Sequence, residues 1–132
     1  MDIIGIDFGR KKIGVALGNS ESRFAEPLQV VRYQSLEEGL EKINDVVKKI
    51  RAGKVVVGVS EGTSKKEAIE FGNQLESKFG IEVVFQDETL TTQDAQRKSI
   101  EAGIKRKTRR DMEDAYAATL ILQEYLDNLQ QI

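Results

Sequence analysis

Cysteine and histidine are both absent from this sequence of 132 residues, and proline occurs only once. The absence of cysteine excludes disulfides, thiol nucleophiles and cysteine metal sites. The absence of histidine removes the most frequent general base and the most frequent zinc ligand. Any catalysis by this chain must therefore use carboxylates, lysines, hydroxyl groups or a hard metal ion.

Long apolar runs are missing as well. No stretch approaches the roughly 20 apolar residues that a membrane-spanning helix needs, and the first residues resemble a strand rather than a signal peptide. We therefore expect a cytoplasmic protein that does not associate with membranes. With one proline and no low-complexity run, residues 1–132 are expected to form a single domain.

The formal net charge of −2 argues against a general polyanion-binding protein. The positive charges are nevertheless bunched in the sequence. The formal net charge also leaves out bound metal ions, so carboxylates that bind divalent cations make the protein look more negative than it is. The net charge therefore does not exclude a nucleic-acid substrate.

Hydrophobic patterning predicts strands and helices in the order βββαβαβαα. The strands are expected at residues 2–8, 12–19, 27–33, 55–59 and 81–86. The helices are expected to be capped by Ser35, Ser64, Thr91 and Thr108, and the first three to end at 52–53, 80 and 103. Residues 55–59 are apolar on both faces, which favours a parallel central strand with helices on either side. The pattern predicts an α/β fold with a mixed five-stranded sheet flanked by helices.

The stretch Gly5-Ile6-Asp7-Phe8-Gly9 takes an apolar strand directly to a carboxylate. Gly9 allows a sharp turn there and leaves Asp7 open at the edge of the sheet. The carboxyl ends of parallel strands meet at one edge, where open α/β sheets place their sites, so Glu88 is expected beside Asp7. Asp114 lies in the first turns of the last helix, on the face predicted to pack on the sheet. The structural alternatives are a capping aspartate in a hairpin for Asp7 and compensation of the helix dipole for Asp114.

Three converging acids without histidine are typical of a site for Mg²⁺ or Mn²⁺, which prefer oxygen ligands. Two such ions, roughly 4 Å apart, can activate water and absorb charge on a phosphoryl group. A basic loop that directly precedes Asp114 is expected to position a phosphodiester backbone, with two lysines of the first turn acting from the other side. The basic residues are Lys105, Arg106, Lys107, Arg109 and Arg110 in the loop and Lys11 and Lys12 in the turn. The alternative for the loop is a solvated basic turn.

The sequence resembles the YqgF family, RNase H-fold proteins that are related to Holliday-junction resolvases and are described as pre-16S rRNA processing nucleases. The resemblance covers nearly the whole chain. Its motifs are Asp7-Phe8-Gly9 with Lys12-Ile13-Gly14-Val15-Ala16, the block Asp87-Glu88-Thr89-Leu90-Thr91-Thr92, and Asp114 followed by Ala117-Ala118. It implies an RNase H-like core, metal-dependent phosphodiester hydrolysis at the 5′ end of pre-16S rRNA, and Asp7, Glu88 and Asp114 as the catalytic, metal-holding acids.

The sequence departs from the family pattern at two places. Thr89 stands where the family usually has an arginine, which removes one candidate phosphate contact. Family members tend to have a Gly-x-Pro segment with a longer loop after the fourth strand, whereas this chain has the different segment 58–63, which brings a fourth acid, Glu61, to the same edge. In the related resolvases a glutamate at the end of the fourth strand is a ligand, so Glu61 is a further candidate for the metal site. The alternative is a loop acid that faces solvent.

Two other functions stay open at this point. The chain can be a non-catalytic nucleic-acid or ribosome-assembly module, although clustered acids are of no use to a pure binder of phosphate backbones. It can also be an actin-like or sugar-kinase-like ATPase, because Gly5 to Gly9 resembles the first phosphate loop of those proteins. ATPases of this kind need two lobes, and this chain supplies one. Structured RNA and branched DNA both fit as substrates, and the chain can act as a monomer or a homodimer.

Overall fold

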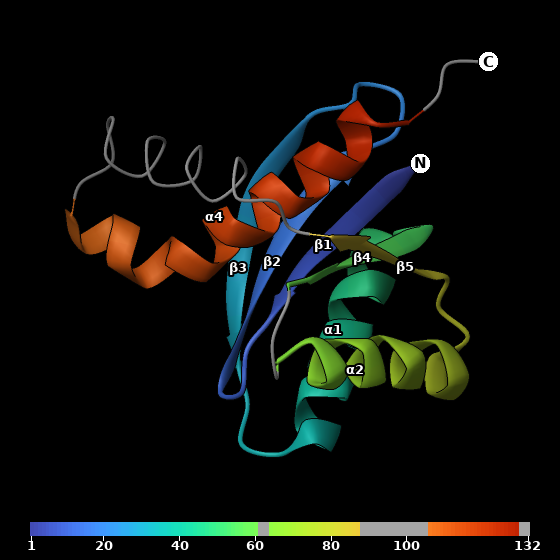
Figure 1. The fold of residues 1–132 in the computed structure, drawn as a ribbon, viewed down its shortest axis with the longest axis vertical. Helices are drawn as coiled ribbons and strands as arrows, with labels where there is room; N and C mark the ends of the chain where they lie inside the picture. The colour runs from blue at the N-terminus through green and yellow to red at the C-terminus, as the bar shows by residue number, and fades with distance from the viewer. Residues whose placement is uncertain (61–63, 88–105, 130–132) are drawn as a thin grey trace.

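The structure, a computed structural model, describes residues 1–60, 64–87 and 106–129. Its elements are β1 (Asp2–Phe8), β2 (Lys12–Asn19), β3 (Ala25–Arg32), α1 (Leu36–Ile50), β4 (Lys54–Val59), α2 (Ser64–Phe79), β5 (Val83–Asp87) and α4 (Arg106–Asp127). They form a five-stranded sheet in the order β3-β2-β1-β4-β5 (Figure 1). Strands β1, β4 and β5 run parallel to one another, whereas the pairs β1–β2 and β2–β3 are antiparallel. The predicted mixed five-stranded α/β sheet is confirmed, and the helix predicted after residue 91 lies outside the described residues.

The described helices cover both faces of the sheet. Helices α1 and α2 pack on one face, and α4 lies across β3, β2 and β1 on the other (Figure 1). Each face has its own buried core, one around Phe71, Leu40 and Ile6 and the other around Leu122 and Ile121. No helix in the described part of the chain is both long enough and apolar enough to cross a bilayer.

Strand β2 has one large and one small face, as its alternating sequence predicts. Ile13 and Val15 are fully buried in the core under α1 and α2. Gly14 and Gly18 lie on the opposite face, where a Cβ atom would run into α4. The small residues therefore let α4 approach the sheet closely.

The third strand begins earlier than predicted. It runs from Ala25 to Arg32 and contains Pro27 in its interior instead of at its start. This is tolerated because β3 is an edge strand, where a proline can face away from the hydrogen-bonded ladder. A register shift between Val15 and Ala16 of β2 accommodates the irregularity.

The ends of α1 were predicted only in part. The Ser35 side chain accepts a hydrogen bond from the Glu38 backbone N–H at 3.2 Å, so the predicted cap is confirmed. The helix does not end at Ala52-Gly53: Arg51 already has a left-handed conformation, with φ of 61°. Gly80 at the end of α2 does adopt the positive φ that glycine favours.

Replacing Arg51 by glycine should stabilise the protein by about 1 kcal/mol, because a side chain in the left-handed region strains the backbone. Alanine at the same position removes the Arg51 side chain but keeps the strain, so Arg51→Ala should leave the free energy of unfolding nearly unchanged. Urea denaturation of both variants measures the difference. Equal stability of the two variants would contradict this account.

The basic segment before Asp114 is helical and not a loop. Helix α4 begins at Arg106, so residues 106–110 form its first turns and Thr108 lies inside the helix instead of capping it. Arginine and lysine are strong helix formers, and nothing between 106 and 110 breaks a helix. The capping tendency of a single threonine is weaker than these propensities together.

Candidate active site

Asp7 lies near the carboxyl end of β1 and on the face of the sheet that α4 covers. Side chains alternate along a strand, so Asp7 shares its face with Ile3 and Gly5. Ile3 belongs to the core beneath α4, and a Cβ atom on Gly5 would lie 2.7 Å from the Cβ of Leu122. The Asp7 side chain is therefore partly buried between the sheet and the beginning of α4.

Gly14 brings the backbone of Asp114 to the same place. It is the cross-strand partner of Asp7 in the β1–β2 ladder. A Cβ atom at Gly14 would overlap the backbone carbonyl of Asp114 and would lie 2.9 Å from the backbone nitrogen of Ala115. The helix thus rests directly on the bare backbone of β2, next to Asp7. Because of this contact, the backbone of Asp114 lies at the same end of β1 as Asp7.

Lys12 completes this arrangement. Its Nζ lies 3.2 Å from Oδ2 of Asp114, and the two side chains are 44% and 29% exposed. Lys12 was predicted to contact nucleic acid, and the structure shows it paired with one of the predicted metal-holding acids. Lys11, the next predicted contact, is exposed, and its backbone carbonyl accepts a hydrogen bond from the Tyr33 N–H.

The other predicted site residues cannot be placed. Strands β4 and β5 end together, because Val59 pairs with Asp87 in the parallel ladder, and this is the edge that carries Asp7. The described residues contain no group of three acids that could hold a metal ion. Three of the predicted residues lie outside the described part of the chain, namely Glu61, Glu88 and Lys105, and the structure describes only the backbone of Arg106, Lys107, Arg109 and Arg110.

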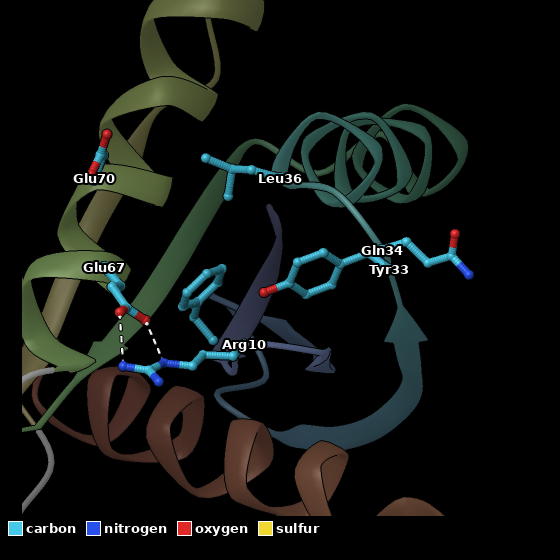
Figure 2. Close-up of a pocket in the computed structure, with 7 residues that line it drawn as sticks. Arg10, Tyr33, Gln34, Leu36, Glu67 and Glu70 are labelled. Atoms are coloured by element: carbon cyan, nitrogen blue, oxygen red, sulfur yellow. Dashed lines mark hydrogen bonds and ion pairs between the residues drawn. The ribbon is translucent and has the colours of Figure 1, made fainter.

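A pocket of about 300 Å³ opens at the same edge but on the other face of the sheet, beneath α1 and α2 (Figure 2). It is lined by Phe8, Arg10, Tyr33, Gln34, Leu36, Glu67 and Glu70. No motif in the sequence predicts this pocket. Its only local signal is Phe8, which follows Asp7 and must face the opposite side of the strand.

An ion pair and an anchored tyrosine shape this pocket. Two bonds at 3.2 and 3.4 Å join the Arg10 guanidinium to the Glu67 carboxylate. The Tyr33 hydroxyl donates a hydrogen bond to the Gly9 carbonyl. Burial, followed by the nearby charge of Glu67, raises the pKa of Tyr33, so this phenol stays protonated at neutral pH.

Comparison with known proteins gives relatives over nearly the whole chain. A protein of Caldanaerobacter subterraneus with the provisional name of pre-16S rRNA nuclease is 40% identical, with 97% of each chain covered. A protein of Lactococcus lactis with the same provisional name is 36% identical over 95% of this chain and 93% of its own.

Solved structures with the same fold include Holliday junction resolvases. RuvC of Thermus thermophilus, solved with a Holliday junction substrate, has a TM-score of 0.62 at 16% identity, with 100% of this chain and 99% of that chain covered. The fowlpox virus Holliday junction resolvase has a TM-score of 0.64 at 13% identity, with 98% and 100% covered. The RNase H-like fold implied by the resemblance is thereby confirmed. The model of the RuvX Holliday junction resolvase family matches residues 1–128, so this chain belongs to that family.

Proposed function

We propose that this chain is a divalent-metal-dependent nuclease that hydrolyses phosphodiester bonds in structured RNA or branched DNA, with processing of the 5′ end of pre-16S rRNA as its role. One observation carries the proposal: α4 rests on Gly14 and so brings Asp114 to the strand end that holds Asp7. Carboxylates from a strand end and a neighbouring helix are a typical source of ligands for a hard divalent cation. The provisional names of the relatives point to the same chemistry.

The described acids suit a hard cation. Asp7 and Asp114 offer carboxylate oxygens, which Mg²⁺ and Mn²⁺ prefer, and Glu88 and Glu61 are the further ligands that we propose from the sequence. When bound, one or two such ions supply an activated water and compensate charge on the phosphoryl group. The chain's own contribution is to hold the two aspartates on a rigid strand and helix, which fixes their oxygens before the substrate arrives.

The basic residues then bind the substrate backbone. Lys12 balances Asp114 in the absence of a cation and is half-exposed, so it can also reach a phosphate oxygen. We propose that Lys105, Arg106, Lys107, Arg109 and Arg110 position the phosphates beside Asp114, and that Lys11 acts from the β1–β2 turn. Arginine suits this role because its planar fork binds two phosphate oxygens.

A cleavage assay with purified protein tests the proposal. Labelled pre-16S rRNA 5′ leader, single-stranded RNA and a four-way DNA junction would each be incubated with Mg²⁺, with Mn²⁺ and with EDTA. We expect cleavage of a structured substrate with either metal and none with EDTA. Tight binding that EDTA leaves unchanged, with no cleavage of any substrate, would contradict the nuclease and support a non-catalytic assembly module.

Replacing Lys12 by glutamine should tighten Mn²⁺ binding about fivefold. The substitution removes a positive charge 3.2 Å from an Asp114 oxygen, and a unit charge at this distance in a solvated site contributes about 1 kcal/mol. Isothermal titration with Mn²⁺ measures the change. Lys11→Gln is the matched control, because Lys11 is exposed and forms no ion pair within the described residues.

The same pair of variants separates metal binding from general electrostatics. A loss of one positive charge anywhere nearby would affect both variants alike. Tighter binding in Lys12→Gln alone supports Asp114 as a ligand, whereas unchanged binding would argue that Asp114 does not hold the metal.

A further inference from the structure

The pocket beneath α1 and α2 has no role in the metal site proposed above. Phe8 lines it, whereas Asp7, the preceding residue, faces α4. Consecutive residues of a strand point to opposite faces, so the pocket and the acids lie on opposite faces of the same strand end. Along the chain, Asp7 of the proposed metal site and Phe8 of the pocket are consecutive, and the turn at Gly9 follows them directly.

The inner wall of the pocket is aromatic. The Phe8 ring is packed 4.7 Å from the Phe71 ring and lies 6.2 Å from the Tyr33 ring, centroid to centroid. The Tyr33 hydroxyl is anchored on Gly9, and Figure 2 shows this hydroxyl turned toward the middle of the pocket while the Gln34 amide points away. At the rim the apolar side chain of Leu36 is 38% exposed. These surfaces suit a flat, apolar group.

The charged rim excludes a phosphate. Glu67 already accepts both bonds from Arg10, and the carboxylate of Glu70 accepts a bond from Gln74 at 3.3 Å. With two carboxylates and one guanidinium the rim is negative, which repels a phosphodiester. The Arg10 side chain is 75% exposed, so its planar guanidinium can lie against an aromatic ligand without breaking the ion pair.

We propose that this pocket receives an unpaired nucleobase of the substrate strand, close to the phosphate that is cut. The inference rests on the proposed nuclease function and adds to it the need for an unstacked base beside the cleavage site. A strand that passes over the sheet edge at Gly9 places a phosphate on the Asp7 side and the neighbouring base on the Phe8 side. Stacking on aromatic side chains is the usual way in which proteins hold unpaired bases.

The first test uses 2-aminopurine, a fluorescent base, at each position around the cleavage site in turn, with EDTA present so that nothing is cut. We expect the emission to change at one position within about two nucleotides of the cut, because stacking on an aromatic ring alters 2-aminopurine fluorescence. The variants Tyr33→Phe and Tyr33→Leu form a matched pair. Both lose the hydroxyl bond to Gly9, and only the leucine variant loses the ring.

The second test replaces the same nucleotide by an abasic one. Wild-type protein and Tyr33→Phe should bind the abasic strand about tenfold more weakly than the intact strand, because the loss of base–aromatic stacking lowers affinity by about this factor. Tyr33→Leu has no ring to stack on and should bind both strands alike. Each comparison is a ratio within one variant, so a general loss of stability cancels. Circular dichroism confirms that each variant is folded.

The outcomes distinguish the two proposals. Two results would overturn the base pocket and leave the nuclease intact. One is metal-dependent cleavage without a change of 2-aminopurine emission at any position. The other is an equal loss of affinity for the abasic strand in Tyr33→Phe and Tyr33→Leu. Stacking of a base in the pocket without cleavage of any substrate would overturn the nuclease, and with it the place of this base beside a cleaved phosphate, and would leave only a base-binding pocket. No nucleic-acid binding by the wild type would overturn both.

Discussion

Replacing Asp7 by asparagine should lower the rate of phosphodiester cleavage by about a thousandfold while leaving the protein folded and able to bind nucleic acid. The amide keeps the size of the side chain but loses the negative charge that a divalent cation needs. Compensation of transition-state charge by such an ion contributes several kcal/mol, and each 1.4 kcal/mol corresponds to about a factor of ten in rate. Single-turnover cleavage with saturating Mg²⁺ measures the effect.

Asp2→Asn is the matched control for this variant. It makes the same substitution in the same strand, at the end of β1 opposite to Asp7. There Asp2 accepts a hydrogen bond from the Asn19 side chain at 2.9 Å, and an asparagine oxygen can still accept it. The control should cleave at the wild-type rate. If Asp7→Asn kept more than about a tenth of that rate, Asp7 would not be the residue around which the site is built.

Much of the sheet could be predicted because its signals are local. The apolar run before Asp7, the large and small faces of β2 and the uninterrupted apolar strand Val55 to Val59 each show in a few consecutive residues. The parallel direction of β1, β4 and β5 was expected because each of these strands is followed by a helix or reached through one, and it is confirmed. Asp7 could be placed at the strand end for the same reason.

The contacts that complete the candidate site are not local and could not be predicted. The pairing of Lys12 with Asp114 joins residues about a hundred positions apart, and so does the contact of Gly14 with the backbone of α4. The small face of β2 indicated a close neighbour but not which one. The predicted start of α4 was wrong because Thr108 resembles a helix cap, whereas the surrounding arginines and lysines continue the helix.

The pocket was missed for a different reason. Its lining residues come from β1, the turn after it, the segment between β3 and α1, the start of α1, and α2, so no motif contains them. Glu67 is an example. Three residues after Ser64, it matches a capping box in the sequence. In the structure its carboxylate accepts a hydrogen bond from Arg10, which lies in the turn after β1. Only the assembled fold reveals such a pair.

Replacing Gly14 by alanine should lower the free energy of unfolding by about 3 kcal/mol, at the upper end of the usual cost of overpacking. The added Cβ would meet the backbone of Asp114 and Ala115, and no rotamer change can move backbone atoms away. The midpoint of thermal unfolding should fall by roughly 12 °C for a chain of this size. Urea and thermal denaturation measure both quantities.

Gly18→Ala is the control that separates backbone contact from mere crowding. Gly18 lies on the same face of the same strand, but a Cβ there would meet the ends of the Leu122 and Leu126 side chains, at 2.8 and 3.0 Å. These side chains can rotate, so we expect a loss of only about 1 kcal/mol. Because Gly14→Ala must push α4 away from β2, it should also abolish cleavage at temperatures where the protein is still folded, and Gly18→Ala should not. Equal losses of stability and activity in the two variants would mean that the approach of Asp114 to Asp7 does not depend on Gly14.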